Sequence, residues 1–479
     1  MIAVANVECK YDGGDRMVRL SRYAHVYDLG DDVALYHSLR MKPVYLNKKA
    51  YEDLQAWLAG PFCNDYEDAP EDIRNEVNEL VKFKILNHSE ENDEKVLKFV
   101  RSRIPAPAVN VCYMITSEQC NLACKYCFLG NNDACKRSNF SLENMSVETA
   151  DKAVDFFIKQ IKLSGMDFEE NKPVIIFYGG EPLVNYEVLV YIAEKINSLR
   201  DVEKCVKNLE MSMVSNGLLL TEKRALKLKE LGVSIAISVD GFTEEANAMR
   251  VDVAGKNVFN KILRTLDMCK RIGVDVSLSV TLSEETIKDT KNILKLVDNY
   301  GIKSFGFNIM MSDENFVLSQ EYNEKATQFI IDEFVELRKR GIYEDRIMRK
   351  LKSFSKAQIY FSDCAATSGG QIVIAPNGQV GICHGCLHNK QYFVSNVDDA
   401  NFNASKHKDF IEWSQLTPIN KDECQECPAL GICGGGCPIN AMHLKKGNTI
   451  HDLDERFCVH SKMTLEFLIK DLYRIIKEG

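Results

Sequence analysis

Between residues 110 and 310, short runs rich in Val, Ile and Ser alternate with longer stretches whose apolar residues recur at helical spacing. The short runs predict strands and the longer ones predict amphipathic helices. Strands that alternate with helices form βαβ units with a parallel sheet, so this part predicts an α/β fold, a partial or full barrel. The expected strands are residues 110–116, 173–180, 209–217, 233–241, 274–282 and 302–310.

Glycines or polar residues follow the first four of these strands directly. The functional residues of such a barrel gather at the carboxyl ends of its strands, so these clusters are expected to meet at one site. They are "QCNLACKYC" (119–127), "GGEP" (179–182), "SNG" (215–217) and "SVDG" (238–241).

The hydrophobic pattern changes before residue 105 and again after residue 315. Alternation at 33–39 and 42–47, followed by helical spacing at 48–58 and 69–86, predicts a small α+β unit of winged-helix size. A long helix pattern follows the barrel, then a cysteine-rich block and a final helix. The expected domains are residues 1–104, the barrel at 105–315, a helical bridge at 316–360 and the cysteine-rich domain at 361–479.

Composition narrows the class of protein. The 479 residues carry a net charge of −9, which argues against a general nucleic-acid binder. The first residues lack a basic segment followed by an apolar core, and no apolar run is long enough to span a membrane, so a cytoplasmic protein without membrane contact is expected.

Seventeen cysteines are unusual for a cytoplasmic protein, and their odd number fits a disulfide framework poorly. Regularly spaced thiolates in a reducing compartment are more typical of zinc or iron–sulfur ligands. Eight of the 17 lie between Cys364 and Cys458, and three more form a Cys-x3-Cys-x2-Cys motif at Cys120, Cys124 and Cys127. A 4Fe–4S cluster that receives only three thiolates keeps one iron open for another ligand.

This motif, in the form Cys-x3-Cys-x-Tyr-Cys-Phe after the first strand and with Gly-Gly-Glu-Pro after the second, resembles the radical S-adenosylmethionine (radical SAM) superfamily. The resemblance implies that Cys120, Cys124 and Cys127 hold a 4Fe–4S cluster whose open iron binds SAM. It also implies that SAM is cleaved to a 5′-deoxyadenosyl radical, which takes a hydrogen atom from a substrate.

The resemblance further implies a set of SAM contacts. Tyr126 would lie by the adenine, residues 179–182 would meet the methionine amino group, and Arg250 would pair with the carboxylate. The polar residues after strands three and four would contact the ribose or carboxylate, although turn or cap roles remain open for them and a surface role for Arg250. The implied contacts are Tyr126, Gly179, Gly180, Glu181, Pro182, Ser215, Asn216, Ser238 and Arg250.

The second cysteine block resembles the SPASM extension of some radical SAM enzymes, which holds two auxiliary 4Fe–4S clusters. By this resemblance Cys424, Cys427, Cys433 and Cys458 would hold the outer cluster, and Cys364, Cys383 and Cys437 the inner one. Cys386 is the expected fourth inner ligand; the alternative is an open iron that binds a substrate thiolate. The alternative interpretation of these spacings is that the cysteines form zinc knuckles.

SPASM enzymes mostly modify peptides or proteins, and the N-terminal unit resembles the winged-helix domain that binds leader peptides by β-augmentation. The alternative is that this unit only packs against the barrel and caps it. The expected function is a radical SAM oxidoreductase that matures a ribosomally made peptide, forming a Cys thioether as in sactipeptides and ranthipeptides. The expected partners are a precursor peptide, bound through its leader, and an electron donor such as flavodoxin or ferredoxin.

Three alternatives stay open: a maturase that forms carbon–carbon crosslinks, a sulfatase-maturating type that makes formylglycine, and a zinc-binding scaffold without redox activity. A base must accept a proton when a crosslink closes. By position alone the candidates are His384, Glu118 and Asp240.

Overall fold

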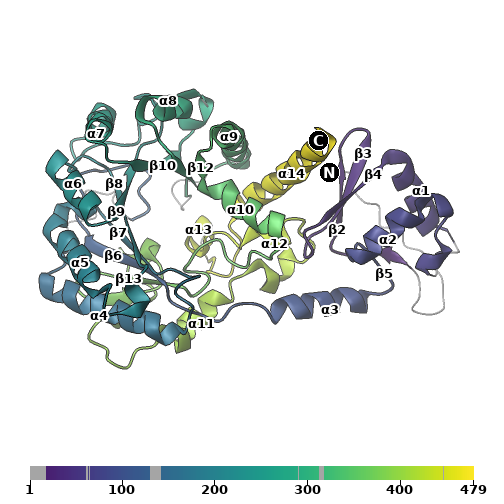
Figure 1. The fold of residues 1–479 in the computed structure, drawn as a ribbon, viewed down its shortest axis with the longest axis horizontal. Coiled ribbons are helices and arrows are strands. Elements are labelled where there is room, and N and C mark those ends of the chain that lie inside the picture. The colour runs from purple at the N-terminus through teal and green to yellow at the C-terminus, as the bar shows by residue number, and fades with distance from the viewer. Residues whose placement is uncertain are drawn as a thin grey trace.

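A computed structural model describes most of the chain (Figure 1). The description that follows concerns only these residues, and Cys9 and Cys135 lie outside them. The described residues are 18–60, 63, 65–129, 142–289, 291–311, 318–445 and 447–478.

A ten-stranded sheet forms the larger part of the molecule, and its middle consists of six parallel strands in chain order. All six strands predicted from the sequence are present, so the α/β barrel prediction is confirmed, with the barrel left open in the described part of the chain between edge strands β12 and β15. The six are β6 (Val111–Ser117), β7 (Val174–Gly179), β8 (Glu210–Ser215), β9 (Val233–Ser238), β10 (Val276–Leu282) and β11 (Ser304–Ile309).

Helices cover the outer face of this sheet (Figure 1). Strand β7 shows why: Ile175 and Phe177 are fully buried on the helix side, whereas Ile176 and Tyr178 alternate with them and face the interior of the barrel. Side-chain oxygens of Ser146, Thr221 and Ser319 cap three of the helices. The outer helices are α4 (Val147–Ser164), α5 (Tyr186–Leu199), α6 (Glu222–Glu230), α7 (Phe259–Arg271), α8 (Lys291–Tyr300) and α9 (Gln320–Lys339).

The C-terminal part adds strands to this sheet that the sequence pattern did not reveal. Strand β13 (Gln371–Ile374) pairs in parallel with β6, and the antiparallel strands β14 (Gln379–Gly381) and β15 (Phe393–Asn396) extend the sheet from there. At the other edge, β12 (Tyr343–Glu344) pairs with β11. The cysteine block therefore lies directly beside the first barrel strand.

Five helices complete the second half of the chain, and one hydrophobic core joins them to the barrel. This core includes Phe307 and Phe334 of the barrel together with Trp413 and Leu465 of the C-terminal part. The helices are α10 (Asp345–Lys356), α11 (Lys408–Ser414), α12 (Leu430–Cys433), α13 (Pro438–Leu444) and α14 (Glu455–Glu478).

The N-terminal unit has a hydrophobic core of its own and lies at the far end of the molecule (Figure 1). It packs against α14: the Tyr45 hydroxyl donates to the Ile469 carbonyl at 3.1 Å, and the Tyr473 hydroxyl donates to Asp32 at 2.7 Å. Its elements are β1 (Arg19–Leu20), β2 (Ala24–Asp28), β3 (Asp32–His37), β4 (Pro43–Asn47), β5 (Leu86–Asn87), α1 (Lys48–Leu58), α2 (Arg74–Lys82) and α3 (Glu90–Arg101). Strands β2, β3 and β4 form one antiparallel sheet, which agrees with the expected α+β unit.

Among the described helices, none combines the length and the apolar character that crossing a lipid bilayer would require.

A buried carboxyl group on α9 makes stability depend on pH. Glu333 is 1% exposed, neither of its carboxylate oxygens has a hydrogen-bond partner in the described structure, and burial raises its pKa to about 8. The folded protein keeps a proton that the unfolded chain releases above its ordinary pKa of 4.5. Stability should therefore fall with rising pH between these two values, by about 1.4 kcal/mol per pH unit.

We expect Glu333→Gln to remove this dependence and to raise the thermal unfolding midpoint most above pH 8. Glu324→Gln, an exposed change on the same helix, is the control. If calorimetry showed that the unfolding midpoints of the two variants depend equally on pH, the raised pKa of Glu333 would be contradicted.

Candidate active site

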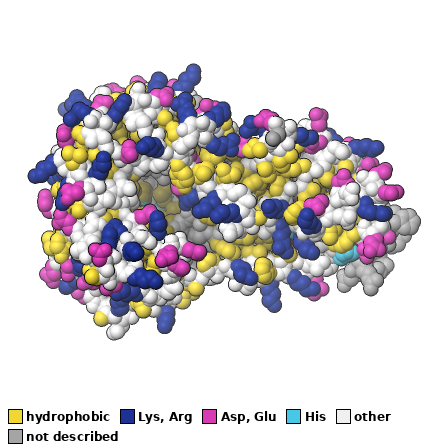
Figure 2. Space-filling model, in the orientation of Figure 1, with side chains coloured by type: hydrophobic (Ala, Val, Ile, Leu, Met, Phe, Trp, Pro, Cys, Tyr) yellow, Lys and Arg dark blue, Asp and Glu magenta, His cyan; other side chains and the backbone are white. Residues whose placement is uncertain are grey.

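A cavity of about 650 Å³ opens at the carboxyl ends of the barrel strands. Figure 2 shows the barrel half of the molecule hollowed on this side. Strands β6 to β11 supply one part of the lining and the C-terminal part supplies the rest, so the two halves of the chain share one space. Of the residues selected from the sequence, the cavity is lined by Cys120, Cys124, Cys127, Tyr126, Gly179, Gly180, Glu181, Ser215, Asn216, Ser238, Arg250, Cys364, Cys383, Cys437 and His384.

The cysteine triad occupies the loop that follows β6. Backbone amides of Ala123 and Lys125 donate to the carbonyls of Val251 and Met249, at 2.8 and 2.9 Å, which holds the loop in place. The three thiols are half-buried, and burial raises the pKa of Cys120 to about 12, with further increases from Cys127 and Cys124. Burial also raises the pKa of Cys124. Three thiols on one loop are a donor set suited to a bound metal, which stabilises the thiolate form.

The backbone of the Gly-Gly-Glu-Pro turn is in direct contact with the backbone of this loop. A Cβ atom on Gly180 would lie 2.2 Å from the Gln119 carbonyl oxygen, and one on Gly179, whose φ is +132°, would lie 2.3 Å from the Ser117 oxygen. The Glu181 amide also donates to the Gln119 carbonyl at 2.8 Å. Both positions therefore require glycine, because the end of β7 and the cysteine loop touch through their backbones.

Glu181 ties this turn to β8, and Pro182 begins the short helix that follows it. The buried Glu181 carboxylate accepts hydrogen bonds from the Ser215 hydroxyl and the Asn216 amide, both at 2.8 Å, and so ties β7 to β8. Burial raises the pKa of Glu181, and the hydrogen bonds oppose this effect. Pro182 does not line the cavity; it begins a short 3-10 helix (Pro182–Asn185). Asn216 also donates to Asn121 at 2.8 Å and lies 3.9 Å from the Cys120 sulfur.

Arg250 has a protein partner that the sequence did not reveal. Its guanidinium binds Asp240 with two hydrogen bonds, 3.1 and 3.0 Å long, and both side chains are buried. The Tyr126 hydroxyl donates to the same carboxylate at 2.5 Å, and the Thr281 amide donates at 3.0 Å. Asp240 is therefore fully engaged and does not line the cavity, which makes it a structural anchor for Arg250 and Tyr126 rather than a free base.

The other two base candidates differ in position. Glu118 forms an ion pair with Lys390 and does not line the cavity. His384 does line it, stacked on Tyr113 with ring centres 4.1 Å apart, and burial lowers its pKa to about 4, so the imidazole is neutral. Of the three candidates, His384 alone reaches the cavity.

The second cysteine block forms two separate groups of four thiols. Cys364, Cys386 and Cys437 are electrostatic neighbours of Cys383, whose pKa is raised by burial and then by these three. The Cys458 thiol, with a pKa raised to about 12 by burial, has Cys433, Cys424 and Cys427 as neighbours. Cys386 lies beside the inner three. Within the described residues, no group of His, Cys, Asp or Glu side chains is close enough to hold a single metal ion.

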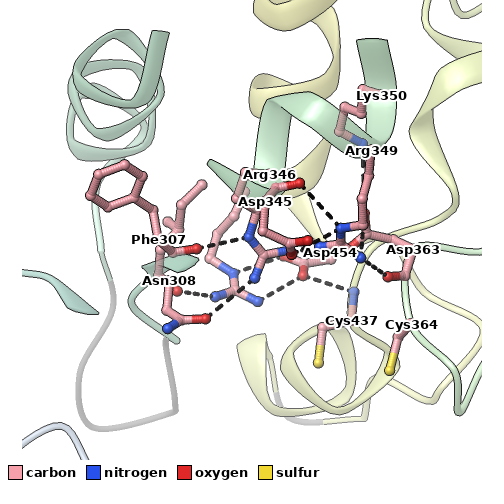
Figure 3. Close-up of polar contacts among 12 residues, drawn as sticks. Phe307, Asn308, Asp345, Arg346, Arg349, Lys350, Asp363, Cys364, Cys437 and Asp454 are labelled. Atoms are coloured by element: carbon pink, nitrogen blue, oxygen red, sulfur yellow. Dashed lines mark hydrogen bonds and ion pairs between the residues drawn. The ribbon is translucent and has the colours of Figure 1, made fainter. Parts of the chain in front are cut away.

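The sequence analysis did not identify the charged side chains that the C-terminal part of the chain contributes to the cavity lining. Arg346 and Arg349 of α10 line it, together with Asp363 and with Arg456 of α14. Figure 3 shows Arg346, Arg349 and Asp363 beside Cys364 and Cys437. These charges follow no spacing motif, and the sequence analysis had placed this segment only within the helical bridge at 316–360.

Comparison with known proteins agrees with this geometry. Residues 114–297 match the family model of the radical SAM superfamily. This part of the chain is a radical SAM domain. The matched region contains the triad, the Gly-Gly-Glu-Pro turn and Arg250.

The enzyme is similar over nearly its full length to the radical SAM cyclopropyl synthase TigE of Paramaledivibacter caminithermalis, with 24% identity over 96% of this chain and 98% of that protein. A cysteine-type anaerobic sulfatase-maturating enzyme of Clostridium perfringens is 24% identical over 69% of this chain and 89% of its own. The solved structure of anSMEcpe with bound AdoMet superposes with a TM-score of 0.60 at 21% identity, over 77% of this chain and 98% of that one, and so shares the fold.

Replacing Gly180 tests the contact between the turn and the cysteine loop. Gly180→Ala should displace the loop and weaken SAM binding to the iron-loaded enzyme by about tenfold or more, measured by calorimetry. Gly306→Ala is the control, because a Cβ atom there would meet no atom within 4 Å. Equal SAM affinity of the two variants would contradict the packing argument.

Proposed function

We propose that the enzyme matures a ribosomally made peptide by removing hydrogen from it and closing a crosslink. The observation that carries this proposal is the shared cavity, into which both the triad and three inner cysteines of the second block open. A substrate residue in that space would lie between two metal-binding groups, one suited to starting a radical reaction and one suited to taking up an electron.

Cys120, Cys124 and Cys127 would hold the first 4Fe–4S cluster, and the two groups of four thiols would hold the auxiliary clusters. When bound, the first cluster and SAM together supply the 5′-deoxyadenosyl radical that removes a hydrogen atom from the substrate. Gly179 and Gly180 let the end of β7 pack against the backbone of the cysteine loop, and the Asp240 anchor fixes Arg250 and Tyr126 at the cavity wall.

Closing a crosslink removes two hydrogens from the peptide. One leaves as a hydrogen atom to the 5′-deoxyadenosyl carbon, and the other leaves as a proton together with one electron. The electron requires a one-electron acceptor, which the second cysteine block would hold, and a carrier such as flavodoxin or ferredoxin to exchange electrons with the protein. His384 lies in the cavity as a candidate proton acceptor.

The N-terminal unit is the proposed binding site for a leader peptide. Strands β2 and β4 are the two edges of its three-stranded sheet, and an edge strand can accept an added strand through backbone hydrogen bonds. The near full-length similarity to TigE includes this unit, whereas the sulfatase-maturating relative aligns with only 69% of the chain.

Two kinds of crosslink are candidates for the product. A Cys thioether is the product expected from the sequence. A carbon–carbon bond is the second candidate, and the similarity to a cyclopropyl synthase over 96% of the chain favours it.

The metal assignment predicts about twelve irons per chain after anaerobic reconstitution, with broad absorption from the clusters. Changing Cys120, Cys124 and Cys127 together to Ala should lower this to about eight irons and abolish formation of 5′-deoxyadenosine, measured by chromatography. Cys269→Ala, at a buried position on α7, should change neither. A colourless protein with stoichiometric zinc would overturn the enzyme's proposed cofactors.

Co-expression with a short reading frame neighbouring the gene tests the substrate class. We expect the peptide to lose two hydrogens per crosslink, detected by mass spectrometry. Treatment with iodoacetamide then separates the two bonds, because a thioether consumes a cysteine thiol and a carbon–carbon bond leaves every thiol free. A peptide of unchanged mass in the presence of active, SAM-cleaving enzyme would count against peptide maturation.

A further inference from the structure

Two buried charged side chains, Lys350 and Asp363, lie between the two four-cysteine groups. Asp363 immediately precedes Cys364 of the inner group, and Lys350 of α10 donates to the carbonyl of Cys433, in the outer group, at 2.9 Å. The Lys350 nitrogen lies 3.8 Å from the Asp363 carboxylate. Figure 3 shows Lys350 and Asp363 in this arrangement above Cys364 and Cys437.

The backbone holds the two cysteine loops together at the same place. The Asp363 amide donates to the Gly434 carbonyl at 2.9 Å, and the Tyr360 amide donates to the Gly431 carbonyl at 2.7 Å. A side chain on Gly434 would clash with the Asp363 amide nitrogen, 2.5 Å away. These contacts therefore hold the segment of Asp363 and Cys364 against the segment that follows Cys433.

Lys350 is shielded from water. Its side chain is 0% exposed, it also donates to the Ile432 carbonyl at 3.2 Å, and its nitrogen lies 5.6 and 5.8 Å from the ring centres of Tyr360 and Phe457. A charge in such surroundings acts more strongly on its neighbours than one at the surface, because little solvent screens it.

The charged neighbours of the two groups differ in sign. Around the inner group, Asp363 is the main charged neighbour of Cys364 and Asp454 that of Cys437, each opposed in part by an arginine. Around the outer group most of the charged neighbours are lysines: Lys350 at Cys433, and Lys421 and Lys462 beside the other three thiols, with Glu423 opposing Lys421 at Cys424.

We propose that Lys350 and Asp363 set the reduction potentials of the two auxiliary clusters in opposite directions, Lys350 raising the outer one and Asp363 lowering the inner one. This rests on the proposed function, in which the two groups hold clusters. Reduction adds negative charge to a cluster, so a nearby cation favours it and a nearby carboxylate opposes it. Lys350 does not line the cavity; Asp363 does, and it would act on the inner cluster from the position next to Cys364.

The test uses full-length protein with Cys120, Cys124 and Cys127 changed to Ala, so that only the auxiliary clusters report. Anaerobic redox titration followed by electron paramagnetic resonance gives both potentials. We expect Lys350→Met to shift the outer potential to more negative values and Asp363→Asn to shift the inner potential to more positive values. Lys352→Met, an exposed change on α10, should shift neither.

The opposite signs separate this role from a structural one, since general loosening would move both clusters in the same direction in both variants. That result, or unchanged potentials, would overturn the inference while leaving the proposed function intact. If Lys350→Met fails to load iron, Lys350→Gln and Asp363→Asn still give the test. Absence of clusters from the triad-deficient protein would overturn both this inference and the assignment of the second block, while SAM cleavage by the unmodified enzyme tests the triad separately.

Discussion

Strand β13 pairs with β6 from Gln371↔Val111 to Ile374↔Met114, and the Gly370 carbonyl accepts hydrogen bonds from the amides of Asn110 and Val111. The triad follows β6, while Cys364 and Cys383 lie on either side of the β13–β14 hairpin. One parallel strand pair therefore brings residues about 250 positions apart in the chain to a single cavity. Because a register shift of one residue would turn the alternating side chains to the opposite face, this pairing also decides which residues of β6 face the cavity.

Buried ion pairs fix the rim of that cavity. Asp240 holds Arg250 under the cysteine loop, and Asp454 holds Arg456 with two hydrogen bonds of 3.0 and 2.8 Å. Arg456 in turn donates to the carbonyls of Ile309 and Met310, which joins the start of α14 to the end of β11. Removal of one partner from such a pair leaves an uncompensated buried charge, at a cost of about 3–5 kcal/mol. These pairs thus tie the cysteine loop and the start of α14 to the ends of the barrel strands.

Much of this arrangement could be read from the sequence because it depends on local patterns. The six barrel strands show as apolar runs between helical stretches, and the cysteine groups show as spacings that match cluster-binding motifs. The partner of Arg250 could not be read in this way: Asp240 was visible only as a polar residue after a strand, and nothing local distinguishes a carboxylate that binds a guanidinium from one that accepts a proton. Strand β13 is only four residues long and fully buried, so it lacks the alternation that marks a half-exposed strand.

The sequence by itself determined the α/β barrel and the three-cysteine motif, because hydrophobic periodicity and ligand spacing are properties of neighbouring residues. The division of the later cysteines into two groups was an expectation from the resemblance to the SPASM extension. Only the tertiary structure decided that the triad and the inner group face one cavity, that His384 lines it while Glu118 and Asp240 do not, and that Lys350 bridges the two later groups. Those facts depend on contacts between distant segments, and such contacts are fixed by strand pairing and by the burial of charge against charge.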